Sequence, residues 1–283
     1  MSDTECTTFL QWALPRLDMR WAGFRKVRGQ VCKRLRQRME RLGLDGFPAY
    51  RARLESDPEE WRELDECCHI TISRFFRDQG VFECLRRRVL PDIAARARRE
   101  GREARCWSAG CASGEEPYTL KILWDLELAP KHPDVSLAIV ATDIDELMLK
   151  RAHAGCFAAT SLRELPADVV NQAFDRIGDR FCVRPRHRAN IAFCAQDLRV
   201  QAPSGLFDLV LCRYLAFTYF SAPLQEKCLG RMVKRLRPRG YLVIGTHERL
   251  PDEEPRLRAF EDVPQIYQLE RAAAVPALAG HDD

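Results

Sequence analysis

The segment 105–118, RCWSAGCASGEEPY, has the residue order of a buried strand, a turn of small residues and the start of a helix. Small residues such as Gly110 and Gly114 let the backbone approach a ligand closely, and nucleotide-like molecules bind at such strand ends. Glu115 and Glu116 would repel a pyrophosphate at the helix N-terminus. The expected ligand is therefore neutral or cationic, with hydroxyl or amino groups to bind.

A second acidic position follows further along the chain. The segment 136–145, SLAIVATDID, is an apolar strand that ends in Asp143 and Asp145. An acid at the carboxyl end of a neighbouring strand commonly binds ribose hydroxyls. Either aspartate could instead cap the helix that begins near Glu146, and the two roles can coexist, one on each residue. The spacing of Gly110 and Gly114 is by itself weak evidence for a binding site. The acidic end of the second strand is the feature that favours one.

The composition indicates a soluble globular protein. The 283 residues are 46% hydrophobic and 30% charged, which allows one large or two modest domains. No stretch approaches a membrane span, and the N-terminus lacks the basic start and apolar core of a secretory signal, so we expect a cytoplasmic location. The net charge of +4 is too small to favour a nucleic-acid partner. The twelve cysteines are scattered without a CxxC pair, and we expect reduced core residues and no metal site.

Helical periodicity fills the first part of the chain, and strands appear only after residue 100. Residues 8–65 place apolar side chains at helical spacing. Beyond them, apolar strands at 104–109, 136–142, 191–195, 207–212 and 240–246 alternate with helical stretches at 116–128, 146–154 and 223–237. This order predicts an α/β fold with a doubly wound, mostly parallel sheet.

We expect a helical domain at 1–68 and an α/β domain at 69–283. Between the second and third strands of the sheet lies an insertion at about 154–190. Within it, residues 166–177 predict a helix and residues 179–188 a short antiparallel strand pair. An insertion beside the carboxyl edge of a sheet often shapes a substrate site, although a plain surface flap fits the pattern too.

Several motifs resemble the CheR-type methyltransferases, which transfer methyl groups from S-adenosylmethionine to glutamate side chains of bacterial chemoreceptors. The motifs are TISRFFRD at 71–78, WSAGCASGEEPY at 107–118, ATDID at 141–145, Cys212-Arg213, Tyr219-Phe220 and GTHE at 245–248. The resemblance covers roughly residues 8–271. It implies S-adenosylmethionine as the cofactor, a helical N-terminal domain, and a seven-stranded methyltransferase sheet whose last strand, at about 265–270, is antiparallel. It also implies a small β-subdomain inserted near 178–190.

The resemblance assigns roles to single residues. The segment 71–77 matches the family's interdomain segment, which touches cofactor and substrate. Glu115 matches a contact to the methionine or ribose part of the cofactor, Asp143 matches the acid at the ribose or adenosine, and Asp197-Leu198 matches the adenine-side contact. The predicted cofactor-binding residues are Thr71, Ser73, Arg77, Gly110, Glu115, Asp143, Asp197, Leu198, Arg213 and Tyr214, and the predicted catalytic residues are Arg77 and Tyr219.

The chain departs from the family pattern beside the expected position of the methyl group. The family has Cys-Arg-Asn followed by five residues ending in Tyr-Phe, whereas here Tyr214 replaces the asparagine and the segment is one residue longer. Asp197 stands where asparagine is frequent. The identity of the methyl acceptor is therefore not decided by the sequence. It is protein glutamate in the favoured hypothesis and a small-molecule thiol, amine or carboxylate in the second, while a third hypothesis is a non-catalytic module that only binds S-adenosylmethionine.

The chemistry of the acceptor decides whether a base is needed. A glutamate is already ionised at neutral pH, with a reference pKa of about 4.3, so alignment is the main requirement. Arg77 could orient the carboxylate through forked hydrogen bonds, with Tyr219 donating another. An amine or thiol would need a base, for which the sequence offers His247, Tyr214 or a glutamate of the 115–116 pair. At a strand exit, however, His247 is more often structural.

A basic face is predicted in the N-terminal domain. Residues 25–41 contain one acid, Glu40, and eight basic residues, namely Arg25, Lys26, Arg28, Lys33, Arg34, Arg36, Arg38 and Arg41. In the family the corresponding helix recognises an acidic receptor helix bundle, which makes an acidic protein the expected partner. A solvated face or a weak nucleic-acid contact would have the same pattern.

Overall fold

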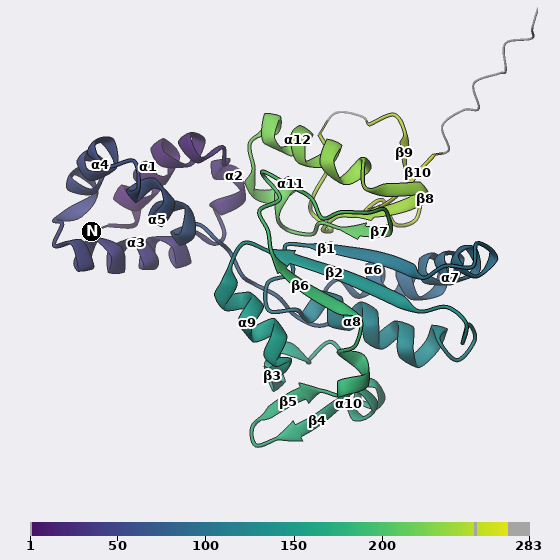
Figure 1. Ribbon diagram of the computed structural model, residues 1–283. Coiled ribbons are helices and arrows are strands. Elements are labelled where there is room, and N and C mark those ends of the chain that lie inside the picture. Colours follow the sequence, from purple (N-terminus) through teal and green to yellow (C-terminus); the bar gives the residue numbers. More distant parts are fainter. Residues whose placement is uncertain (1, 252–253, 271–283) are drawn as a thin grey trace, which may run out of the picture.

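The computed structural model describes residues 2–251 and 254–270, and its first part is a set of short helices around one core. They are α1 (Asp3–Ala13), η1 (Leu14–Leu17), α2 (Trp21–Phe24), α3 (Arg28–Leu42), α4 (Gly46–Ser56) and α5 (Glu60–Cys67). Leu10, Leu35 and Tyr50 are completely buried at its centre. These helices lie on the left in Figure 1 and confirm the predicted all-helical N-terminal part.

The second part is built on a seven-stranded sheet with the order β6-β2-β1-β7-β8-β10-β9. The strands are β1 (Ala104–Ala109), β2 (Leu137–Asp143), β6 (Ile191–Ala195), β7 (Phe207–Leu211), β8 (Leu236–Val243), β9 (Leu257–Ala259) and β10 (Ile266–Leu269). The first five strands in this order are parallel, while β10 is antiparallel to both of its neighbours. The predicted mostly parallel sheet with an antiparallel last strand is therefore confirmed.

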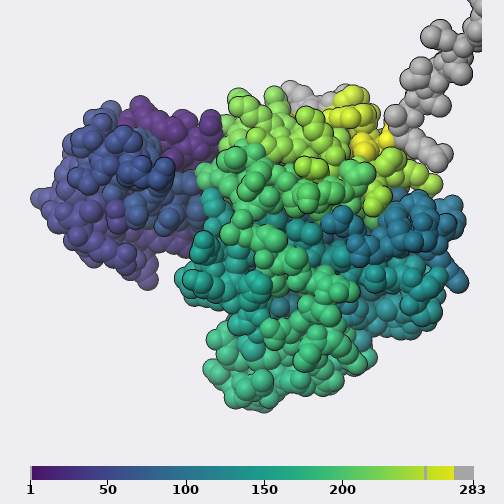
Figure 2. Space-filling model, in the orientation of Figure 1, coloured from purple at the N-terminus to yellow at the C-terminus, as the bar shows by residue number. Residues whose placement is uncertain are grey.

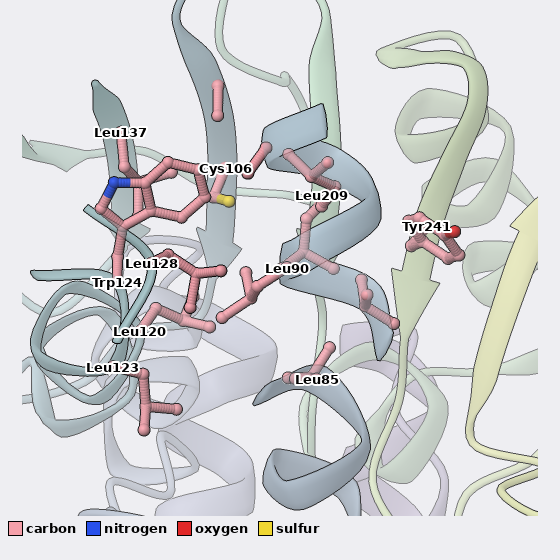
Figure 3. Packing of buried hydrophobic residues seen from close by; sticks show 14 of the residues in the cluster. Leu85, Leu90, Cys106, Leu120, Leu123, Trp124, Leu128, Leu137, Leu209 and Tyr241 are labelled. Carbon is pink, nitrogen blue, oxygen red and sulfur yellow. The ribbon is translucent and has the colours of Figure 1, made fainter. Parts of the chain in front are cut away.

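Helices cover both faces of the sheet because successive side chains of a buried strand point to opposite sides. Cys106 and Leu209 pack against Trp124 on one face, together with α6 (Gln79–Cys84), η2 (Leu85–Val89), α7 (Leu90–Arg99), α8 (Glu115–Leu123) and η3 (Trp124–Leu128) (Figure 3). Trp107 and Val210 face α11 (Ala216–Tyr219) and α12 (Ala222–Val233) on the other. Helix α9 (Glu146–Ala154) packs against β6 at the sheet edge.

A small β-subdomain projects from the sheet-containing body, as Figure 2 shows. It contains β3 (Cys156–Ala158), η4 (Ala159–Ser161), α10 (Ala167–Ala173), β4 (Phe174–Ile177), β5 (Arg180–Val183) and η5 (Pro185–His187). The hairpin lies earlier than the predicted 179–188, because the chain turns at Gly178 (φ +62°) and pairs Phe174 with Val183. The helix predicted to reach residue 177 consequently ends at Ala173.

Two disulfides overturn the expectation that all cysteines are reduced. Cys6 of α1 pairs with Cys32 of α3, and Cys156 of β3 pairs with Cys182 of β5. Each pair is created by the packing of two elements, which cysteine spacing alone does not reveal. The remaining cysteines are free, and most of them are buried as expected, although Cys194 is exposed.

The described helices contain none whose length and apolar content would suit a bilayer crossing. The C-terminal end of the predicted α/β domain, residues 271–283, lies outside the described residues.

Candidate active site

A cleft of about 1070 Å³, counting the space open to solvent, lies at the carboxyl ends of β1, β2, β6 and β7. The segment that leaves α5 and residues of α2 close it on the side of the N-terminal helices. Every predicted site residue except Glu115 lines this cleft, namely Thr71, Ser73, Arg77, Gly110, Asp143, Asp197, Leu198, Arg213, Tyr214 and Tyr219.

Asp143 ends β2 and faces the cleft. Its carboxylate accepts hydrogen bonds from the backbone N–H of Ala112 at 2.7 Å and of Asp145 at 2.9 Å. An ionised carboxylate has about four acceptor sites, so about two remain for a ligand. Burial raises the pKa of Asp143, while the two backbone N–H groups counteract it. Asp145 instead caps α9 through the N–H groups of Leu147 and Met148.

The two adjacent acids at the start of α8 differ in orientation. Glu115 is 3% exposed, does not line the cleft, and accepts a hydrogen bond from the Ser113 hydroxyl at 2.8 Å. Burial raises its pKa. Glu116 lines the cleft and accepts from Ser108 at 2.7 Å and from Arg213 at 2.9 Å. Neighbouring helical residues point in different directions, so Glu116 lies on the cleft wall, while Glu115 lies behind it, hydrogen-bonded to Ser113 and to the cleft-lining Ser73.

The segment after β6 connects the cleft to the N-terminal helices. Asp197 accepts from the backbone N–H of Arg199 at 2.8 Å and from its guanidinium. The same guanidinium forms two hydrogen bonds with Asp65 of α5, at 2.8 and 2.7 Å. Sequence reasoning missed Arg199, although a basic residue so close to an aspartate that replaces the family's asparagine was an available signal. Leu198 beside them is buried.

Arg213, which follows β7 on the cleft wall, is a buried cation that binds both side-chain and backbone oxygens. Its Nη2 donates to Asp78 at 2.7 Å and to the carbonyl oxygen of Arg77 at 2.6 Å, while Nη1 donates to Glu116. Only 4% of its side chain is exposed. Arg213 therefore fixes the backbone of residues 77–78. Most of its N–H donors are engaged in these hydrogen bonds. Asp78 was not among the predicted residues.

Arg77 has a different environment. Its Cζ lies 3.7 Å from the ring centroid of Tyr214, and its Nη1 donates to the carbonyl oxygen of Ile72 at 2.9 Å. The adjacent Asp78 pairs with Arg213, and Arg77 has no ion-pair partner among the described residues. A guanidinium that lines a cleft without a counter-ion can bind a planar carboxylate through two parallel hydrogen bonds.

Tyr219 stands where the N-terminal helices meet α11. Its ring packs against Phe24 with a centroid distance of 4.9 Å, and burial raises its pKa to about 12. The phenol is therefore a neutral hydrogen-bond donor at physiological pH. His247, considered as a base, is exposed and does not line the cleft. It belongs to a separate depression after β8.

The sheet order, the acid that ends β2 and the cleft at the strand ends define a methyltransferase that uses S-adenosylmethionine. The chain belongs to the CheR methyltransferase family. The S-adenosylmethionine-binding domain of CheR methyltransferases matches residues 71–265, and the all-alpha domain of the same family matches residues 26–65. The protein is therefore an enzyme, and its cofactor is S-adenosylmethionine.

Relatives from several bacteria match most of the chain. A probable chemotaxis protein methyltransferase of Rhizobium etli is 36% identical over 230 residues, which are 79% of this chain and 85% of the relative. Chemotaxis protein methyltransferase 1 of Pseudomonas aeruginosa is 34% identical over 247 residues, 84% of this chain and 85% of the relative. An uncharacterized 104.1 kDa protein of Rhodobacter capsulatus is 33% identical over 88% of this chain, which spans only 26% of that protein.

Proposed function

We propose that the protein methylates glutamate carboxylates of an acidic protein, of the kind presented by a chemotaxis receptor in the cytoplasm. The observation that carries the proposal is the guanidinium of Arg77 on the cleft wall, which forms no ion pair with any residue that the structure describes. It offers a carboxylate two parallel hydrogen bonds beside the phenol of Tyr219. S-adenosylmethionine supplies the methyl group on a positively charged sulfur. The polypeptide has to bind the acceptor, orient one carboxylate oxygen and exclude water.

The cofactor side of the cleft suits such a ligand. Asp143 retains free acceptor sites for ribose hydroxyls, and no described residue forms an ion pair with its carboxylate. Gly110 and Leu198 also line the cleft, and the buried Leu198 provides an apolar surface for the adenine ring. A pyrophosphate would face the carboxylate of Asp143, so the lining favours a cofactor without phosphates, as the sequence predicts.

The acceptor side favours a carboxylate over an amine or a thiol, because the bases that the sequence offers are not available there, and the histidine that lines the cleft, His69, lies 3.4 Å from Asp65. His247 lies outside the cleft. Burial raises the pKa of both Tyr214 and Tyr219, so neither phenol ionises readily. Glu116 is occupied by Ser108 and Arg213. A glutamate acceptor needs no proton removal, since it is ionised at neutral pH.

The basic face is smaller than the sequence suggests. Arg38 pairs with Glu60 and Glu63, Arg34 donates to backbone carbonyls after α5, and Arg28 and Arg36 lie near Asp3. The exposed cations are Arg25, Lys26, Lys33 and Arg41. We assign these four as the docking surface for the acidic partner, supported by their charge and exposure.

The test is transfer of radiolabelled methyl groups to the cytoplasmic fragment of a bacterial chemoreceptor. Mild alkali should release the label as methanol, because esters hydrolyse while N- and S-methyl groups stay attached. Arg77→Lys should lower kcat/KM about a hundredfold, since an ammonium cannot reproduce the planar fork. Calorimetry with S-adenosylhomocysteine measures separately how far this variant weakens the cofactor contact that the resemblance also assigns to Arg77. An alkali-stable product, or label only in small molecules of a cell lysate, would contradict the proposal.

A further inference from the structure

We infer that Tyr214 is a positioning residue for the acceptor, because it holds the guanidinium of Arg77 in place on the cleft wall. The inference rests on the proposed function and adds to it the group that orients the carboxylate-binding arginine. Tyr214 stands at the position where the family pattern has asparagine, so the feature belongs to this chain and not to the pattern.

The contacts of the tyrosine lock its ring in one orientation. The phenol hydroxyl donates to Asp78 at 2.6 Å and lies 2.7 Å from the hydroxyl of Thr246, which can donate to it in turn. Gly245 leaves room for the ring, because a Cβ there would lie 2.8 Å from Cε1 of Tyr214. With its edge fixed at these points, the ring presents its face to Arg77, whose Cζ lies 3.7 Å from the ring centroid.

The backbone of Tyr214 is strained, and a buried carboxylate holds it there. Its φ of +56° lies in the left-handed region, which asparagine tolerates better than a bulky aromatic residue. Glu248, 6% exposed, accepts hydrogen bonds from the N–H groups of Tyr214 at 2.9 Å and Gly245 at 2.7 Å. It also accepts from the hydroxyl of Thr218 at 2.5 Å. Glu248 therefore ties the tyrosine to α11, which carries Tyr219.

These contacts restrict the side chain of Arg77. The ring covers one face of the Arg77 guanidinium, and the carbonyl oxygen of Ile72 fixes Nη1. The remaining N–H groups lie in the guanidinium plane, where a carboxylate binds. Ordering this arginine before the acceptor arrives lowers the entropy cost of binding. If Tyr214 acts through Arg77, and not as the cofactor contact that the resemblance assigns to it, its loss should weaken binding of the acceptor and leave the affinity for the cofactor unchanged.

Two variants separate the ring from its hydroxyl. Tyr214→Leu removes both, and Tyr214→Phe keeps the ring under Arg77 and serves as the better-folded control. Binding of the receptor fragment to the S-adenosylhomocysteine complex is measured by calorimetry, without turnover. We expect Tyr214→Leu to weaken this binding about tenfold and Tyr214→Phe about threefold. The affinity for S-adenosylhomocysteine should stay within about twofold of the parent protein.

A double-mutant cycle with Arg77→Lys distinguishes positioning from general structural support. If Tyr214 acts through the guanidinium, Tyr214→Leu should weaken fragment binding much less in the Arg77→Lys background than in the parent. Equal losses in both backgrounds, or a parallel loss of S-adenosylhomocysteine affinity, would overturn the inference. A wrong proposed function would give a different result: the parent protein itself would form no alkali-labile ester on the receptor fragment.

Discussion

The two sides of the cleft are built in different ways. On the cofactor side, Asp143 and the glycine turn come from strand ends, and backbone N–H groups orient the carboxylate. The acceptor side combines side chains from separate segments, including Arg77, Tyr214 and Glu248, which buried charges hold together. Left-handed φ values of residues other than glycine occur on both sides, at Ala112 beside Asp143 and at Phe76, Asp78 and Tyr214 on the second side. The proposed cofactor side therefore depends on the ends of adjacent strands, while the proposed acceptor side depends on contacts between separate segments.

The N-terminal helices contact both sides, again by different physical means. At the cofactor side the contact is ionic, since Arg199 joins Asp65 of α5 to Asp197. At the acceptor side it combines hydrogen bonds from Arg20 to the carbonyl oxygens of Phe217 and Thr218 with close packing, because a Cβ on Gly23 of α2 would overlap the carbonyl oxygen of Thr218. Only the ionic contact should respond to pH.

The largest expected effect comes from breaking the ionic contact with Asp65→Asn. Burial opposes ionisation of Asp65, yet hydrogen bonds from His69 and Arg199 lower its pKa to about 2. Because this pKa is lower in the folded protein than the value of about 3.9 in the unfolded chain, ionised Asp65 stabilises the fold at pH values above about 4. This contribution is lost as the pH falls from about 4 toward 2. The variant should lose about 2 kcal/mol of unfolding free energy at neutral pH, as measured by urea denaturation.

The difference between Asp65→Asn and the parent should shrink between about pH 4 and pH 2. Gly23→Ala is the matched control for the packed contact. It should cost about 2 kcal/mol by steric overlap, with no such dependence on pH. A constant difference for Asp65→Asn across this range would show that the ionic contact does not stabilise the fold.

A smaller effect is expected within the cofactor side alone. Asp143→Ala should weaken binding of S-adenosylhomocysteine about tenfold, or about 1.4 kcal/mol, if its free acceptor sites bind ribose hydroxyls. Asp145→Ala is the control, because that side chain caps α9, and its loss should lower stability without changing affinity. Calorimetry that finds equal affinities for Asp143→Ala and the parent would remove Asp143 from the site.

The same contrast explains which features the sequence could predict. Strand periodicity, the small-residue turn and the acid after β2 are local patterns, and they located the sheet and most of the cofactor side. Local patterns could not decide whether Glu115 or Glu116 faces the cleft, since both belong to one helical turn. Arg199 with Asp65 and Glu248 with Tyr214 are pairings between distant segments, so only the fold reveals them. The disulfides were missed for the same reason, whereas the hairpin was misplaced because its turn is at Gly178 and its first strand begins at Phe174, inside the predicted helix.

The smallest expected effect concerns the exposed cations, which lie outside the cleft. Replacing Lys26, Lys33 and Arg41 by glutamate should lower kcat/KM for the receptor fragment about fivefold at low salt, because rim charges mainly affect encounter. The effect should nearly vanish at 1 M salt, where the Debye length is about 3 Å. Cofactor affinity should not change.

The matched control reverses the exposed cations of Arg99, Lys131 and Lys234, which lie on the α/β part and change the net charge equally. If both triple variants slow methylation to the same extent, overall charge is responsible and the basic face has no special role. Arg34, Arg36 and Arg38 are unsuitable for this test. Arg38, for example, is paired with the buried Glu60, and removing one partner of such a pair destabilises the fold. A loss of activity in variants of these three arginines would therefore reflect a destabilised fold and not weaker docking.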